Sequence, residues 1–176
     1  MLQIEKVSKT YHSKGIDYPV LRDVTAAIHD GEFVAIMGPS GSGKTTLLNV
    51  ISGFIRADGG KVILDGQDIL TGEENEIAEI RQHKLGFVFQ DFMLLNGLTI
   101  RENIFLPQII AGKGKVQMEQ NTQNLLSIFG MEDIAEKYPA EVSGGQKQRA
   151  SIARALSNHP SVILADEPTG GVQLVV

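Results

Sequence analysis

With 176 residues, the chain is long enough to form one ordinary domain around a sizeable hydrophobic core. A formal net charge of −5 gives no electrostatic reason to expect a nucleic-acid partner, and the absence of cysteine excludes disulfides and favours a reducing compartment. No apolar run is long enough to span a bilayer, and the charged, alternating start MLQIEKVSKTY predicts neither a signal peptide nor direct membrane insertion.

The N-terminal segment predicts two strands. Residues 2–11 have apolar positions spaced as in a strand, and a polar loop is expected over residues 12–19. A second strand is expected over about residues 20–28, before the turn signal Asp30-Gly31.

A strand, a glycine-rich turn and a helix are expected next, in the stretch FVAIMGPSGSGKTTLLNV at residues 33–50. The apolar residues 33–37 have the pattern of a strand that is buried on both faces. The turn and the helix start match the phosphate-binding pattern G-x-x-x-x-G-K-[ST] in the strand–loop–helix context that it requires. A purely structural turn is the alternative, but every position of the pattern is met. The residues expected to bind nucleotide here are Gly38, Ser40, Gly41, Ser42, Gly43, Lys44, Thr45 and Thr46.

The chemistry of this loop suits a nucleoside triphosphate. Glycines let consecutive backbone N–H groups face inward, and the helix N-terminus adds partial positive charge at the same point. Lys44 can reach the β- and γ-phosphates, and the Thr45 hydroxyl suits Mg²⁺.

The middle of the chain changes from strand to helix. Residues 61–64 predict a strand, residues 73–84 a helix, and residues 85–89 a buried strand that ends at Gln90. Residues 91–158 form a mainly helical insertion in this interpretation, and residues 1–90 with 159–176 form the core. A capping box of Thr99 and Glu102 predicts a helix start near residue 100, which Pro107 limits or kinks. Further helices are expected over residues 116–129 and 131–137.

A second glycine-rich helix start lies at Ser143, Gly144, Gly145 and Gln146. Ser143 and Gln146 fit another capping box, and two glycines leave the N-terminus of a helix to about residue 156 without side chains. The pattern indicates a second anion site, although Ser-Gly-Gly is also a common linker sequence.

An apolar strand at residues 162–165 ends in two carboxylates, Asp166 and Glu167. Ligand chemistry lies at the carboxyl ends of strands in open parallel sheets. Asp166 suits Mg²⁺, and Glu167 suits the orientation of an attacking water. A solvated strand end without function is the alternative.

Together, GPSGSGKTT, the glutamine at residue 90, VSGGQ at residues 142–146 and VILADEPTG at residues 162–170 resemble the ATP-binding subunit of an ABC transporter. The resemblance implies an α/β P-loop NTPase fold: a mixed or parallel sheet, an antiparallel N-terminal β part and a helical subdomain. It implies ATP and Mg²⁺ as ligands and hydrolysis of ATP coupled to transport.

The resemblance also assigns roles that spacing alone does not. Tyr11 matches the aromatic residue that stacks on adenine, although it could be a plain strand-end tyrosine. Gln90 matches the glutamine that contacts the metal and the water, and residues 143–145 match the signature that binds ATP held by a second subunit. Residues 92–95 match the place where the family takes a coupling helix from its membrane subunit, with ordinary core as the alternative.

The implied partners are a second ATPase subunit in a head-to-tail homodimer and integral membrane permease subunits, at the cytoplasmic face of the membrane. Three features are closest to the subgroup that serves macrolide, lipoprotein and antimicrobial-peptide exporters: the loop at residues 12–20, GFVFQDFMLL at residues 86–95 and ENIFLP at residues 102–107. A cell-division ATPase of that subgroup, and an ABC ATPase that acts without a membrane partner, are the alternatives.

The sequence departs from the family in two places. Val142 stands where leucine is usual, which we expect to be mild. After Gly170, the family's aspartate loop, later strands and histidine have no counterpart in the residues to Val176, which suggests a frameshifted or truncated product, or an incomplete gene sequence. We therefore expect an exposed apolar sheet edge, aggregation and weak or no turnover, so that a non-catalytic ATP-binding fragment is a further alternative.

Overall fold

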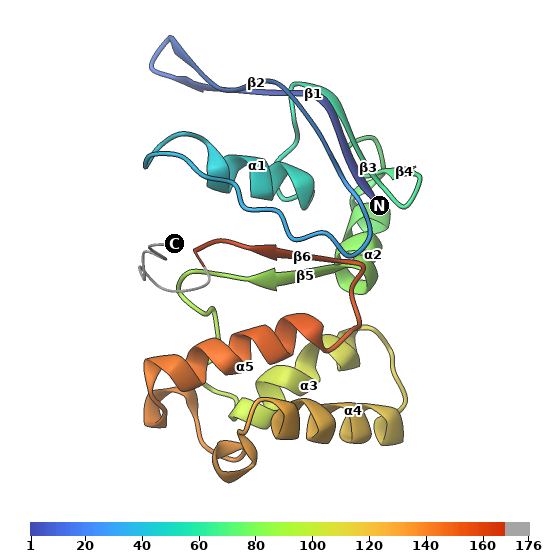
Figure 1. Ribbon diagram of the computed structural model, residues 1–176, viewed down its shortest axis with the longest axis vertical. Coiled ribbons are helices and arrows are strands. Elements are labelled where there is room, and N and C mark those ends of the chain that lie inside the picture. Colours follow the sequence, from blue (N-terminus) through green and yellow to red (C-terminus); the bar gives the residue numbers. More distant parts are fainter. Residues whose placement is uncertain (168–176) are drawn as a thin grey trace. The chain divides into compact units, whose positions relative to one another are not determined.

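The computed structural model describes residues 1–167 (Figure 1). The chain divides into two compact units, residues 1–81 and residues 82–176, which are described separately. The predicted residues of EPTG beyond Glu167, and the divergent end at residues 171–176, lie outside the described part. Within residues 1–167, no helix is both long and apolar enough to cross a bilayer.

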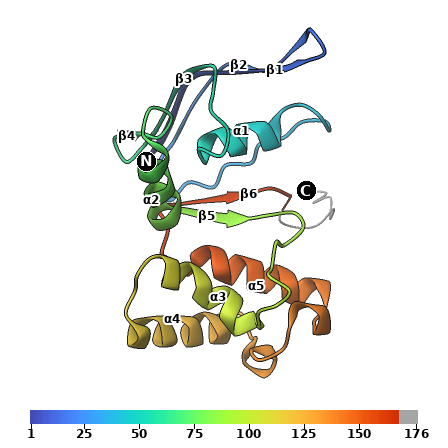
Figure 2. The ribbon, with the colours of Figure 1, turned by 180° about the vertical axis from the view of Figure 1, so that it is seen from behind.

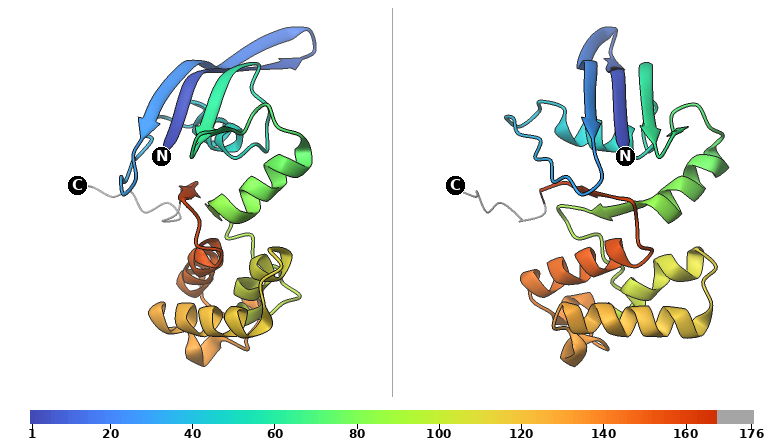
Figure 3. Two further views of the ribbon diagram at one scale, coloured as in Figure 1. Left: turned by 90° about the vertical axis from the view of Figure 1, so that its right-hand side faces the viewer. Right: turned by 45° about the vertical axis from the view of Figure 1, so that its right-hand side comes forward.

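The first unit is built on a four-stranded antiparallel sheet in the order β2-β1-β3-β4 (Figure 3). The strands are β1 (Leu2–Ser13), β2 (Ile16–Ile28), β3 (Gly59–Leu64) and β4 (Gln67–Asp68). Leu2 and Ile4 are buried in alternation, and the alternation skips to Val7 because a bulge interrupts the pairing with β2 between Ile4 and Val7.

The predicted loop over residues 12–19 is wrong. Strands β1 and β2 continue through it as a hairpin, with Ser13 paired to Ile16. Lys14 and Gly15 form the two-residue turn, and both have positive φ, at 50° and 77°. A two-residue turn of this handedness matches the twist of a hairpin, and the polar composition of the segment concealed it.

The strand predicted at residues 33–37 is also absent. These residues have no regular secondary structure, and Phe33 and Met37 are 97% and 90% exposed. In the part of the chain that the structure describes, no strand pairs with them. The apolar run has the composition of a central strand, but a strand exists only where neighbouring backbone accepts its hydrogen bonds.

Two helices complete the first unit. Helix α1 (Lys44–Ile51) buries Leu47, Val50 and Ile51. Helix α2 (Glu74–Lys84) begins in this unit, and its end belongs to the second unit. Helix α1 begins at Lys44, within the predicted helix start, and α2 matches the predicted segment 73–84 to within one residue.

The second unit combines a parallel strand pair with three helices (Figure 2). Strands β5 (Leu85–Val88) and β6 (Val162–Ala165) pair in parallel, and helices α3 (Ile100–Ile110), α4 (Lys115–Ile128) and α5 (Gly144–Leu156) accompany them. Gly86 lets α5 approach β5, because a Cβ there would lie 2.5 Å from the Ala155 carbonyl oxygen. The helical core includes Ile100, Ile104, Leu126, Met131 and Ala150.

Two local predictions in this unit need correction. The third helix expected over residues 131–137 is a single 3-10 turn, η1 (Glu132–Ile134), and a second turn, η2 (Pro139–Glu141), follows it. Pro107 does not end α3, which continues to Ile110; the alternative, a kink at Pro107, stays a prediction. The segment 131–137 is too short to sustain a helix of its own. At Pro107, the helix loses one backbone N–H hydrogen bond and meets one steric conflict, which α3 tolerates.

Candidate functional site

The glycine-rich loop of the first unit leads directly into helix α1. Gly41 has φ 78°, and Gly43, at the N-cap of α1, has φ 92°. The Ser42 N–H donates to the Pro39 carbonyl, which closes a tight turn, and no side chain caps the helix. The N-terminus of a helix carries partial positive charge, which favours an anion at this point.

Lys44 folds back across the loop. Its Nζ donates to the carbonyl oxygens of Gly38 and Pro39 at 2.8 and 3.0 Å. These two hydrogen bonds hold the ammonium group against the backbone of the loop. A phosphate there would meet one full positive charge and several donors, so the residues present fit a nucleotide phosphate.

One glycine of the loop is required by its conformation and its close contacts. Gly43 has φ 92°, and a Cβ there would lie 2.9 Å from Val20 Cγ1 and 3.2 Å from the Val20 carbonyl oxygen. The end of the loop is thus packed against strand β2, and glycine keeps this course without strain. A Cβ on Gly38 would lie 2.8 Å from Ser42 Oγ, a hydroxyl that can rotate away.

Tyr11 lies near the end of β1, in the hairpin that extends past α1 (Figure 1). Its ring is 38% exposed and faces the Lys9 ammonium, 5.8 Å from the ring centre. An exposed aromatic face on the same unit as the phosphate loop suits a stacking role, which stays a prediction.

The second unit places two predicted residues after the ends of paired strands from distant parts of the sequence. Val88 is the register partner of Ala165, and the Asp166 N–H donates to the Val88 carbonyl at 3.0 Å. Gln90 follows β5 and Asp166 follows β6, so both leave adjacent parallel strands at their carboxyl ends. Glu167 comes next, exposed, with φ 47°.

The donor set suits a hard cation. A carboxylate at Asp166, an amide at Gln90 and a hydroxyl at Thr45 are all oxygen ligands, the type that Mg²⁺ prefers. These residue types fit the ion that the phosphate loop requires. Their assignment as metal ligands stays a proposal.

The second glycine-rich helix start forms the predicted capping box. Ser143 Oγ accepts from the Gln146 N–H at 3.3 Å, and the Ser143 N–H donates to Gln146 Oε1 at 2.8 Å. Gly144 and Gly145 have open space where a Cβ would stand, and neither has positive φ. Within the described chain, nothing in packing or backbone geometry requires glycine at these two positions.

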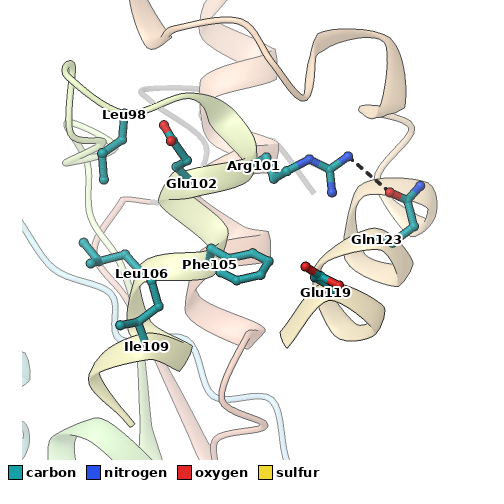
Figure 4. Close-up of a pocket in the computed structure, with 8 residues that line it drawn as sticks. All are labelled: Leu98, Arg101, Glu102, Phe105, Leu106, Ile109, Glu119 and Gln123. Atoms are coloured by element: carbon teal, nitrogen blue, oxygen red, sulfur yellow. Dashed lines mark hydrogen bonds between the residues drawn. The ribbon is translucent and has the colours of Figure 1, made fainter. Parts of the chain in front are cut away.

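A hollow of about 680 Å³ lies in the second unit, between α3 and α4 (Figure 4). It is lined by Leu98, Arg101, Glu102, Phe105, Leu106, Ile109, Glu119 and Gln123. Arg101 donates to Gln123 Oε1 across it at 3.2 Å, as Figure 4 shows. None of the predicted nucleotide or metal residues lines this hollow.

Sequence reasoning missed a set of polar contacts around residues 92–98. Arg154 on α5 and Asn103 on α3 both bind the backbone of this segment. Met93 and Leu95 are exposed, whereas Leu94 packs against the helical core. The sequence holds one signal that could have indicated the Arg154 contact: an arginine on the buried side of an amphipathic helix.

Comparison with known families gives one consistent result. A family model described as "ABC transporter" matches residues 21–170. The chain is 46% identical over 172 residues to the ABC transporter ATP-binding protein YxdL of Bacillus subtilis, covering 98% of this chain and 66% of YxdL. It is 42% identical to the bacitracin export ATP-binding protein BceA of Halalkalibacterium halodurans, covering 98% of this chain and 68% of BceA.

A larger relative and a solved structure agree with this. The macrolide export ATP-binding/permease protein MacB of Escherichia coli O157:H7 is 42% identical over 98% of this chain, which spans 26% of MacB. The dimeric structure of MJ0796, a bacterial ABC transporter cassette, superposes with a TM-score of 0.90 at 40% identity, covering 98% of this chain and 76% of that one. A second structure of MJ0796, bound to ADP and Pi after hydrolysis, superposes with a TM-score of 0.89.

Proposed function

Because the chain belongs to the ABC transporter family, we propose that it binds MgATP and, as a head-to-tail dimer, hydrolyses it to drive export through membrane permease subunits. The resemblance found in the motifs, and the P-loop α/β fold that it implied, are confirmed. The activity, the dimer and the permease partner are proposals for this chain. The peripheral position at the cytoplasmic face of the membrane, reached through the permease, is part of the same proposal.

The observation that carries the catalytic proposal is that Asp166 and Gln90 follow the carboxyl ends of two adjacent parallel strands, β6 and β5. This edge is where open sheets of this class place their reacting groups. In the proposed reaction, water attacks the γ-phosphate in line. Glu167 orients the water, and Gln90 contacts it.

The phosphate loop supplies the charge for this reaction. Lys44 neutralises the β- and γ-phosphates, and the loop N–H groups bind their oxygens. Thr45 and Asp166 would hold Mg²⁺, which supplies further positive charge at the transferring phosphate when it is bound.

The bare start of α5 supports a role toward a partner subunit. Gly144 and Gly145 are exposed and have no steric need to be glycine in this chain. The proposal explains them: with Ser143, they would approach the γ-phosphate of ATP held by the second subunit, where a Cβ would obstruct the backbone donors.

The relatives support an export substrate of a limited kind. Bacitracin export is named for BceA and macrolide export for MacB. We propose an antimicrobial peptide, a lipoprotein or a macrolide-like molecule as the substrate here.

Steady-state MgATP turnover by the purified chain tests the proposal. We expect Lys44→Ala to lose ATP binding, and Glu167→Gln to keep binding while turnover falls by a factor of about 100 or more. Binding is read from a fluorescent ATP analogue, so the two steps are measured separately. Turnover that survives in Glu167→Gln would reject Glu167 as the water-orienting residue.

A second candidate is an ATP-binding chain without turnover. The exposed residues 33–37, which have no strand partner among the described residues, favour it. ATP binding that Lys44→Ala abolishes, with turnover no higher than in that variant, would select this candidate.

A further inference from the structure

Arg154 lies in the last turn of helix α5 and binds two consecutive carbonyl groups of another segment. Its Nη1 donates to the Met93 carbonyl at 2.5 Å, and its Nη2 donates to the Phe92 carbonyl at 2.8 Å. Burial lowers the pKa of the Arg154 guanidinium from its usual value. Within residues 1–167, no carboxylate pairs with Arg154, so the two carbonyls are what compensates its burial.

The two acceptor residues have a backbone conformation that needs support. Phe92 has φ 60° and Met93 has φ 50°, in the left-handed region that residues with a Cβ rarely adopt. Two such residues in succession point their carbonyl groups to one side, where the planar fork of a guanidinium can bind both. A lysine ammonium at the same place would be a single point charge.

The same segment is fixed from its other end by helix α3. The Leu95 N–H donates to Asn103 Oδ1 at 2.7 Å, and Asn103 Nδ2 donates to the carbonyls of Leu95 and Leu98, each at 3.1 Å. Asn103 is buried, and α3 packs against α5. Residues 92–98 are therefore held between two packed helices.

The Arg154 contact connects two parts of the chain that carry predicted site residues. Gln90 precedes the segment by two residues, and Ser143 to Gln146 form the start of the helix that carries Arg154. Arg154 lies eleven residues along α5 from Ser143, a rigid span of about 16 Å.

We propose that Arg154 is a positioning residue that ties the segment after Gln90 to the helix of the Ser-Gly-Gly motif, so that the two move together. Gln90 would respond to the metal and the water in one ATP site, and the start of α5 would serve the ATP of the partner subunit. Arg154 would then link the two sites within one chain. This inference rests on the proposed function for its purpose, but the contact itself can be tested without it.

Hydrogen exchange of the full 176-residue chain, read by mass spectrometry, tests the link. In Arg154→Lys, which keeps the charge and loses the fork, we expect amides of residues 92–98 to exchange at least tenfold faster. Arg22→Lys, an exposed position on β2, is the matched control and should leave that exchange unchanged. Unchanged exchange of residues 92–98 in Arg154→Lys would overturn the proposal.

A second reading separates linkage from plain stability. In the wild type, a non-hydrolysable ATP analogue with Mg²⁺ should slow exchange both at residues 86–95 and at residues 142–147. In Arg154→Lys, the slowing of exchange that the analogue causes should fall at least threefold at one of the two segments relative to the other. Equal responses in the variant would overturn the proposal. A wild type that does not bind the analogue would reject the proposed function instead, while the tenfold effect on residues 92–98 would still support the contact.

Met93→Gly covers the case in which Arg154→Lys does not fold. It keeps the guanidinium and removes a side chain that is 59% exposed, in a conformation that glycine adopts freely. If the Arg154 contact holds the segment, exchange of residues 92–98 should stay within threefold of the wild type. Loss of protection in Met93→Gly would show that packing of the Met93 side chain holds the segment, and would overturn the proposal.

Discussion

Single glycines of this protein differ in what they do, and the difference can be measured. Gly43 has φ 92° and no room for a Cβ beside Val20, whereas Gly145 has open space. We expect Gly43→Ala to lower the free energy of unfolding by about 1–2 kcal/mol or more, from the left-handed conformation alone. Gly145 lies inside a helix, so Gly145→Ala should raise the free energy of unfolding by up to about 1 kcal/mol.

Urea denaturation of the two variants checks this prediction at the residue scale. ATP turnover of the same variants is then compared with their stability. If the bare start of α5 serves a partner subunit, Gly145→Ala should reduce turnover although it does not reduce stability. A Gly145→Ala variant that is clearly less stable than the wild type would contradict the open environment seen at this position.

At the scale of elements, the junction between β1 and β3 depends on one carboxylate. The pairing of these strands is interrupted between Glu5 and Ser8, and the Thr10 N–H donates instead to Asp58 at 2.6 Å. The hydrogen bond from Lys9, followed by that from Thr10, lowers the pKa of Asp58 below its usual value of 3.8. A lowered pKa in the folded state adds stability that is present above about pH 4 and lost as the pH falls through the folded-state pKa.

We therefore expect Asp58→Asn to melt a few degrees below the wild type at pH 7, because the charged acceptor is lost. The gap should begin to narrow as the pH falls below 3.8 and close only below the lowered folded-state pKa, where the wild-type carboxylate also becomes protonated. Thermal melting followed by circular dichroism from pH 7 to pH 3 measures this. Glu79→Gln, an exposed carboxylate on α2, is the control and should show no such gap; a gap for Asp58→Asn that does not narrow at all over this range would argue against the ion pair.

For the whole molecule, the decisive feature is the apolar segment at residues 33–37. Phe33 and Met37 are almost fully exposed, and an apolar stretch of this kind favours association. We expect Phe33→Ser with Met37→Ser to raise the protein concentration at which light scattering begins. Val116→Ser, at an isolated position that is 67% exposed on α4, should not. Equal effects of both changes would show that residues 33–37 are not the associating surface. The expectation that the chain aggregates and turns over weakly stays a prediction.

Much of the candidate site could be predicted because its signals are local. The positive φ of Gly41 and Gly43, the capping boxes at Thr99 and Ser143, and the run of apolar residues before Asp166 each depend on a few neighbouring residues. Local patterns of this kind determine turns and helix ends wherever they occur. The roles assigned to Tyr11, Gln90, Glu167 and the signature residues, and the division into a core and a helical insertion at residues 91–158, stay predictions.

By itself, the sequence determined the family, the phosphate loop and the longer helices, since these depend on short motifs and on periodicity. Only the tertiary structure decided which strands find partners. Residues 33–37 have the composition of a buried strand and form none, whereas residues 12–19 read as a loop and form a hairpin. Tertiary structure also revealed the Arg154 contact with residues 92 and 93, sixty-two and sixty-one positions away. The physical reason is common to all three: strand pairing and side-chain contacts over long separations depend on neighbours that the local sequence does not specify.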